Sequence, residues 1–479
     1  MLYFPDILVI FFYFFLISIL GYYYSRRQKN TKDFFKGGER IPAWAAGLSL
    51  FGTALSPITF MAIPAKTYNT DWSYFLLNMS IFLAIPLVVG IFIPFYRKKN
   101  IKTAYEYLEK RFNVLTRLMG SVCFILYQIG RMGVVLFLPS IALNLVTDMN
   151  IYVCISLMGV ISLIYTLMGG IEAVIWTDVV QVFVLMSGVT ISLLMIVWDT
   201  EGGFTGIVET AWTNSKFNVF DLTLSLKEPT VWVMLLGGFF VNLTTYGTDH
   251  TMVQRYLVTP SEKKAQKSIW IGALLTIPST LIFFFLGTAL FVFYKTNPTT
   301  LQSDFITNDA IFPWYIVTQL PPGISGLLIS AIFAAAMSSL SSSMNAGASS
   351  FSNDIYDRFG FGKKGTDLKI ARWVTFCIGA LGIIFAFFMA SYEIKSLWDE
   401  FNKILGLIFG SLGGVFLLGL LTKRANSEGV LIGMLTSFVI QITISYHETF
   451  HLLLYAASGV ISCFVSGYIA SLFFKSKSY

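Results

Sequence analysis

Thirteen stretches of this chain are apolar and long enough to cross a lipid bilayer, and they limit the fold more than any other feature. A spanning helix needs about 20 mostly apolar residues, and the chain is 55% hydrophobic but only 12% charged. Because the bilayer core offers no water to unpaired backbone groups, only helices and closed barrels can span it. Segments of this length predict an all-α integral membrane protein with about 13 transmembrane helices.

The distribution of basic residues predicts how these segments are oriented. The segments lie at 5–24, 42–65, 72–96, 117–146, 150–170, 173–197, 229–254, 269–294, 316–351, 370–391, 401–421, 427–446 and 450–474. Of the 33 Lys and Arg residues, 26 fall in alternate connections and the C-terminal tail, at 26–40, 97–117, 255–267, 358–372, 423–424 and 475–477. By the positive-inside rule these parts are cytoplasmic, so we expect the N-terminus outside and the C-terminus inside.

The net charge of +7 therefore reports topology and does not point to nucleic acid. The four cysteines are dispersed through apolar segments, at Cys123, Cys154, Cys377 and Cys463. This spacing predicts neither a disulfide framework nor a metal cluster, and we expect all four to be small core residues. No feature of the sequence points to an obligate protein partner.

A run of serines lies inside one apolar segment, where residues 334–343 read Ala-Ala-Ala-Met-Ser-Ser-Leu-Ser-Ser-Ser. At helical spacing Ser338, Ser341 and Ser342 share one face, with Ser339 beside it. Several neutral oxygens near one point suit a small hard cation, which predicts a buried sodium site. The alternative is that small residues only allow two membrane helices to pack closely.

The second segment contains a proline at mid-membrane depth. Pro57 frees a carbonyl one turn earlier, so we expect a discontinuous helix there. Ser56 is a suitable N-cap and Pro57 a suitable first residue for the second half-helix. Carbonyls on one side of the break can hold a cation, and the positive helix end on the other can hold a carboxylate. A kink without ligands is the alternative.

A second interruption is predicted five segments later, where Gly237 and Gly238 precede the polar run 242–250. Interruptions at matching positions of two halves are typical of inverted-repeat transporters with a site at the membrane midplane. The sequence thus predicts one transporter domain over 1–479. Its parts are an extra helix at 5–24, repeats of five helices at 42–197 and 229–421, and two final helices at 427–474.

Arg131 lies in the middle of a predicted segment, where a charge is costly and normally faces a cavity and a partner. Asp178 is a possible structural partner, but it lies near the inner end of another segment. We therefore favour a ligand-binding arginine, because a planar guanidinium matches a carboxylate.

Two motifs make the chain recognisable. Residues 165–181, Tyr-Thr-Leu-Met-Gly-Gly-Ile-Glu-Ala-Val-Ile-Trp-Thr-Asp-Val-Val-Gln, resemble the signature of the sodium:solute symporter family, and 249–257 resemble a second family motif. Residues 56–66 and Gly130-Arg131 are similar to the bacterial sodium-coupled sialic acid members. The resemblance implies a LeuT-type fold and import of sialic acid (N-acetylneuraminate) with sodium by alternating access. It also implies a multi-pass protein of a bacterial-type plasma (inner) membrane, and no enzymatic activity.

The resemblance further implies roles for individual residues. The substrate-binding residues would be Ser56, Thr59, Asn78 and Arg131. A first sodium would be held by the carbonyls of Gly52, Leu55 and Ala335 and the hydroxyls of Ser338 and Ser339. A second sodium would be held by Asp178, Ser338, Ser341 and Ser342. The chain departs from the family pattern at three positions. It has Ala54, Asn78 and Met337 where the family pattern has Thr, Gln and Gln, respectively.

Other functions remain open at this point. A symporter for another small solute, such as proline, a sugar or a carboxylate, would share these features, and a channel would share the ion site. The sequence from His447 to His451 matches H-E-x-x-H, which on a helix can bind zinc for hydrolysis. That match falls in a short outside connection, which argues against a catalytic cleft.

Overall fold

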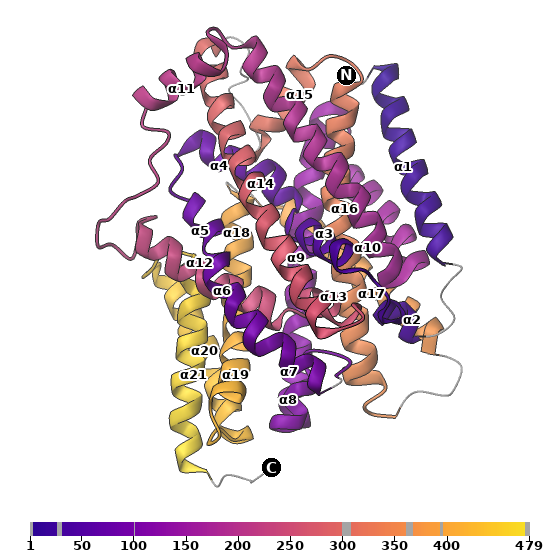
Figure 1. Cartoon of the computed structure of the whole chain (residues 1–479), viewed down its shortest axis with the longest axis vertical. Coiled ribbons are helices and arrows are strands. Elements are labelled where there is room, and N and C mark those ends of the chain that lie inside the picture. Colours follow the sequence, from indigo (N-terminus) through magenta and orange to yellow (C-terminus); the bar gives the residue numbers. More distant parts are fainter. Residues whose placement is uncertain are drawn as a thin grey trace.

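The chain folds into a bundle of membrane-length helices (Figure 1). The computed structural model describes residues 3–25, 31–99, 101–298, 308–360, 367–392 and 396–474, and these ranges contain no strand. Within them, eleven helices are long and apolar enough to cross a membrane, and a bent pair of helices makes a twelfth span. The prediction of an all-α membrane protein is confirmed.

The first half of the chain forms α1 (Phe4–Ser25), α2 (Thr31–Lys36), α3 (Ala43–Ala54), α4 (Ile63–Asn69), α5 (Phe75–Met79), α6 (Ile81–Leu87), α7 (Ile93–Lys98), α8 (Glu106–Arg111), α9 (Val114–Thr147), α10 (Ile151–Asp199) and α11 (Gly203–Thr213). The second half forms α12 (Val231–Thr248), α13 (His250–Leu257), α14 (Glu262–Thr296), α15 (Ile311–Gln319), α16 (Ile324–Ser350), α17 (Asp367–Ala390), α18 (Leu397–Ile404), α19 (Gly410–Leu421), α20 (Ser427–His447) and α21 (Leu454–Phe473). Wider π turns continue several of these helices, at Ile58–Ala62, Val88–Phe92, Phe351–Tyr356 and Leu405–Phe409.

The predicted segments at 150–170 and 173–197 are the two arms of α10. Gly170 separates them with φ 53° and ψ −171°, a backbone conformation that favours glycine. The first arm runs from Ile151 to the break at Gly170, which agrees with the predicted extent of the segment. The start of α1 and the end of α21 lie on opposite sides of the bundle, as an odd number of crossings requires (Figure 1). Several predicted cytoplasmic basic residues lie outside the described residues, namely Arg26, Arg27, Lys29, Lys363, Lys364, Lys475 and Lys477.

The predicted break at Pro57 is confirmed. The helix stops at Ala54 and resumes at Ile58, and the two pieces are bent by 59°. Pro57, and not Ser56 as predicted, is the residue at the N-cap of the π turn Ile58–Ala62, and no side chain caps it. Instead, the hydroxyl of Thr59 donates to the carbonyl of Ala54 across the break, at 3.2 Å.

The second interruption lies later than its glycines indicated. Gly237 and Gly238 lie inside the continuous helix α12, and the break comes at Asp249 (φ −70°, ψ 116°). The Asp249 carboxylate accepts a hydrogen bond from the backbone N–H of Thr251 at 2.7 Å and so begins α13. The two glycines serve close packing: a Cβ on Gly237 would lie 2.7 Å from the carbonyl oxygen of Leu453.

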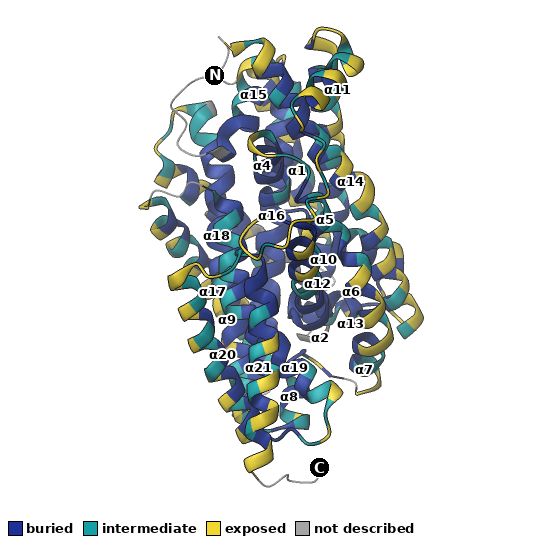
Figure 2. Cartoon of the chain, turned by 90° about the vertical axis from the view of Figure 1, so that its left-hand side faces the viewer, coloured by how far each residue is buried: buried dark blue, intermediate teal, exposed yellow. Residues whose placement is uncertain are grey.

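Helix α16, which carries the serine run, lies at the centre of the bundle. Nearly all of its residues are buried, whereas the outer helices expose one face (Figure 2). The helix packs against α1, α9, α10 and α17. Cys123, Cys154 and Cys463 are buried as predicted, but Cys377 on the outer helix α17 is exposed, so its assignment to the core was wrong.

The N-terminus of α16 is held by an acid from α1. Asp6 is 1% exposed, and its Oδ1 accepts hydrogen bonds from the backbone N–H groups of Gly323 (2.7 Å) and Gly326 (2.8 Å). The carboxylate thus satisfies amides that have no partner within the helix and opposes the positive helix end. A Cβ on Gly326 would lie 2.5 Å from the Cα of Asp6, so glycine permits this close approach.

Replacement of Asp6 by Ala should destabilise the protein by about 1–2 kcal/mol, because two buried amides lose their acceptor. Thermal unfolding of the detergent-purified protein measures this loss. Glu428→Ala is the matched control, since Glu428 is an exposed acid in the first turn of α20. Equal melting temperatures for the Asp6 variant and the control would contradict a capping role.

Candidate functional site

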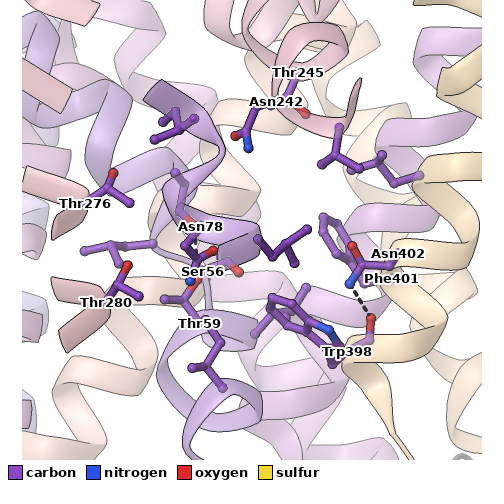
Figure 3. A pocket seen from close by; sticks show the side chains of 18 of the residues that line it. Ser56, Thr59, Asn78, Asn242, Thr245, Thr276, Thr280, Trp398, Phe401 and Asn402 are labelled. Carbon is purple, nitrogen blue, oxygen red and sulfur yellow. Dashed lines mark hydrogen bonds between the residues drawn. The ribbon is translucent and has the colours of Figure 1, made fainter. Parts of the chain in front are cut away.

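An open cavity lies beside the break in the second span. Its wall includes Ser56 and Thr59 from the broken helix, Asn78 from α5 and Arg131 from α9. All four predicted substrate-binding residues therefore meet in one place. Figure 3 shows Ser56, Thr59 and Asn78 grouped on one side of this cavity, across from residues of α18.

The rest of the wall contains polar residues that the sequence did not assign to the site. Asn242 and Thr245 come from α12, and Thr276 and Thr280 come from α14 (Figure 3). The spacing of each pair places both members on one helix face. Trp398, Phe401 and Asn402 of α18 complete the wall, and Asn402 donates to the carbonyl of Trp398 at 2.8 Å. Mostly apolar walls with a few polar groups are typical of a small-molecule site.

Arg131 is buried in this wall and forms no ion pair with a described carboxylate, although the buried carboxylate of Asp249 interacts with its charge at longer range. Arg131 is 5% exposed, and its Nη2 donates to the backbone carbonyl of Thr53 at 2.8 Å. Its Nε has no hydrogen-bond partner, and among the described residues no carboxylate forms an ion pair with it. A guanidinium that lines a cavity with free donors can bind an anionic ligand through a charge-assisted hydrogen bond.

The predicted ligands of the first sodium lie where α16 faces the broken helix. The hydroxyl of Ser338 is 3.3 Å from the carbonyl oxygen of Gly52 and donates to it. The hydroxyl of Ser339 is fully buried and has no partner. Leu55 and Ala335 are buried in the same core. The Ser339 hydroxyl without a partner follows Ser338, which contacts a carbonyl of the broken helix, and sodium binds such neutral oxygens.

The predicted second site contains an ion pair that the sequence did not indicate. Asp178 is fully buried, and its Oδ2 lies 3.0 Å from the guanidinium of Arg255. Ser338 donates to Oδ1 at 2.8 Å, and Ser342 accepts from Arg255 at 2.6 Å. Ser341 donates only to the carbonyl of Ser338 in its own helix, at 3.1 Å. Three of the four predicted ligands thus belong to one hydrogen-bonded cluster with Arg255.

The assignment of Arg255 to a cytoplasmic connection was wrong, since its side chain is fully buried in α13. Beyond Asp178 and Ser342, it donates to the hydroxyl of Ser49 and to the carbonyl of Thr251. The position of Arg255 within the motif 249–257 could have indicated that it is part of the site. Arg117, also counted in a connection, is buried too and pairs with Asp354 at 2.7 Å.

The H-E-x-x-H match does not form a zinc-binding helix face. Helix α20 ends at His447, and Glu448 has a left-handed backbone (φ 46°). His451 therefore lies outside the helix, where its ring faces the hydroxyl of Tyr74 at 3.4 Å. Two histidines must share one helix face to bind zinc through this motif, so the hydrolase alternative loses its structural basis.

Comparison with known proteins identifies the family. Residues 34–437 match the model of the sodium:solute symporter family. The chain is 39% identical to the sodium/sialic acid symporter SiaT of Proteus mirabilis, over 95% of this chain and 92% of that protein. It is 38% identical to the sodium/sialic acid symporter NanT of Aliivibrio fischeri, over 95% of this chain and 90% of that protein.

A solved structure agrees with this result. It shows the substrate-bound outward-open state of a Na⁺-coupled sialic acid symporter, and it matches with a TM-score of 0.93 and 37% identity over 100% of both chains. The predicted LeuT-type transporter fold is confirmed, and the zinc-hydrolase alternative is excluded. The chain therefore belongs to the sodium:solute symporter family.

Proposed function

We propose that this protein imports sialic acid (N-acetylneuraminate) together with sodium. Two relatives that are sodium/sialic acid symporters support this substrate, since each is nearly 40% identical along almost the whole chain. The fold supports transport by alternating access, in which one repeat moves against the other around a fixed site. The moving units would be the repeats at 42–197 and 229–421.

The observation that carries the proposal is the unpaired guanidinium of Arg131 in the cavity wall. A buried charge without a partner is costly, so a bound anion would offset part of that cost. The carboxylate of sialic acid would pair with Arg131, while Ser56 and Thr59 would donate to it and Asn78 would contact the sugar. The start of the second half-helix would add its positive dipole end.

The expected orientation of the chain in the membrane supports import as the direction of transport. By the positive-inside rule we expect the N-terminus outside and the C-terminus in the cytoplasm, and we propose a bacterial-type inner membrane as the location. The described basic residues at 97–111 lie with α8 on the same side of the bundle as the end of α21 (Figure 1). We expect the inward sodium gradient and the membrane potential to drive uptake from the outside.

Sodium would bind at two places. The first ion would be held by Gly52, Leu55, Ala335, Ser338 and Ser339. Asp178, Ser338, Ser341 and Ser342 would hold the second, once Arg255 yields part of its bonding to the ion. One sodium with one sialate moves no net charge, whereas two sodium ions with one sialate move one positive charge inward. The membrane potential then contributes about 2.3 kcal/mol per 100 mV.

Replacement of Arg131 by Ala should weaken sialic acid binding by about 2–5 kcal/mol, because a desolvated charge pair is lost. Arg131→Lys should restore binding only in part, since an ammonium lacks the bidentate fork. Calorimetric titration at saturating sodium measures both. Thr280→Val is the matched control, because Thr280 lines the same cavity without a charge. Wild-type affinity in the Arg131→Ala variant would refute the assignment.

The choice of substrate needs a separate measurement, since Arg131 can bind other carboxylates. We expect sodium-dependent uptake of labelled sialic acid by reconstituted protein, and none of proline, glucose or a short monocarboxylate added in parallel. Uptake that saturates with substrate also distinguishes a carrier from a channel. Preference for any of the other solutes would overturn the substrate while leaving the family intact.

Replacement of Ser339 by Ala should raise the sodium concentration needed for half-maximal uptake, because the first ion loses one of about five oxygens. Sialic acid affinity at fixed sodium should fall with it, since the two ligands are thermodynamically linked. Ser343→Ala is a matched control: Ser343 lies on the same helix, and its buried hydroxyl also has no partner. The same sodium dependence in both variants would argue against the first site.

Replacement of Ser341 by Ala tests the second sodium without breaking the buried ion pair, because its hydroxyl bonds only within its own helix. We expect wild-type vesicles to show an inward positive current with sialic acid and a sodium Hill coefficient above one. The Ser341 variant should show a lower coefficient and weaker dependence on potential. Asp178→Asn should act more strongly, since it also leaves Arg255 unpaired. Electroneutral uptake by the wild type would rule out the second ion.

A further inference from the structure

A second open cavity, which shares no lining residue with the substrate site, lies between the ends of α7, α8 and α19. Lys99, Lys110 and Arg111 line it, together with the apolar walls of Phe95 and Leu420. The three helices lie side by side at the lower face of the bundle in both views (Figures 1 and 2). Nothing in the transport mechanism uses these residues.

The depth of this cavity is that of the lipid headgroups. Two membrane spans end beside it, one at Lys98 and the other at Leu421. Leu421 remains 60% exposed on the outside of the bundle, as expected for a residue in contact with lipid. A cavity at the ends of two spans therefore opens where a phospholipid phosphate lies.

The charges of the cavity are only partly neutralised. The ammonium of Lys110 pairs with Glu106 at 2.7 Å, yet its side chain stays 45% exposed. Arg111 donates to the carbonyls of Gly419 (3.3 Å) and Thr422 (2.8 Å), and carbonyls leave its full charge in place. The exposed ammonium of Lys99 has no acid partner among the described residues. One carboxylate thus faces three cations.

The carboxylate of Glu106 is ionised near neutral pH and carries a negative charge. Burial raises the pKa of Glu106, but hydrogen bonds from the Lys102 backbone N–H and from Lys110 outweigh it and leave the pKa below its usual value. The net charge of the cavity wall is therefore positive, which favours an anionic occupant.

A tyrosine adds an unused donor to the same wall. Tyr107 is 4% exposed, and its hydroxyl has no hydrogen-bond partner. A buried hydroxyl without a partner is costly, so it marks a place where a ligand can restore a bond. The hydroxyl lies against Gly419 of α19, where an added Cβ would overlap with it, so glycine leaves room for the tyrosine.

We propose that this cavity binds the phosphate of an anionic phospholipid headgroup. Lys99 and Lys110 would attract the phosphate, Tyr107 would donate to it, and Phe95 and Leu420 would pack against the upper part of the acyl chains. Arg111 would contribute charge while it holds the end of α19. Basic cavities between spanning helices on the cytoplasmic side suit such headgroups. The apolar walls favour a lipid over free phosphate, which has no apolar part to bury.

Native mass spectrometry of the detergent-purified full chain tests this site by titration with phosphatidylglycerol or phosphatidylcholine. We expect the wild type to bind phosphatidylglycerol more tightly than phosphatidylcholine. Lys99→Gln with Lys110→Gln should weaken phosphatidylglycerol binding about tenfold, and Tyr107→Phe should weaken it to a lesser degree with every charge retained. Binding of phosphatidylcholine should be the same in all variants. Size-exclusion profiles confirm that the variants fold.

The matched control is Lys263→Gln with Lys264→Gln, which removes two exposed charges from the same side of the bundle at the start of α14. This pair should keep wild-type affinity for phosphatidylglycerol. Equal weakening by both pairs would mean diffuse attraction and would overturn the site. Inorganic phosphate and glycerol phosphate should not displace the bound lipid at millimolar concentration. Displacement by either would make the ligand a free phosphate and overturn the lipid assignment.

Discussion

The buried ion pair of Asp178 and Arg255 is the interaction on which the rest of the structure depends. Both side chains are fully buried, and a charge without a partner at this depth would be costly. The pair tolerates burial because almost every polar atom has a partner: Ser49 and Ser338 donate to the carboxylate, and the guanidinium also donates to Ser49, Thr251 and Ser342. A buried ion pair is stable only while its hydrogen-bond geometry is maintained. The cluster therefore restrains the helices that carry its side chains.

These helices come from both halves of the chain. Asp178 is in α10 and Ser49 in α3, whereas Arg255 is in α13 and the serines are in α16. The pair therefore joins the broken helix of the first half to the short helix that follows the break in the second. Its net charge is zero, so sodium near it would meet a carboxylate whose charge is already balanced. An ion can use that carboxylate only by sharing it with Arg255, which makes ion binding sensitive to small movements of α13.

The sequence allowed much of this architecture to be predicted, for reasons that are local. The spans follow from apolar length, and the break at Pro57 follows from the missing N–H of proline. Arg131 was predicted not to pair with Asp178 because their depths differ, and Asp178 pairs with Arg255 instead. The partner of Asp178 was not predicted, because Arg255 follows an apolar segment and looked like part of a basic connection. Only the break at Asp249 turns that arginine inward, and the position of a break depends on tertiary contacts.

The position of Arg131 gives a physical reason for substrate and sodium to favour one another. Its guanidinium donates to the carbonyl of Thr53, the residue after Gly52, whose own carbonyl faces Ser338. This positive charge lies one residue from the proposed first sodium site, where it would repel a cation. A bound carboxylate would neutralise the charge, so sodium would bind more tightly. The coupling is reciprocal, because a bound sodium must then raise the affinity for the carboxylate by the same factor. Because Arg131 forms no direct ion pair with a described carboxylate, its charge would be available to couple the binding of the two proposed ligands.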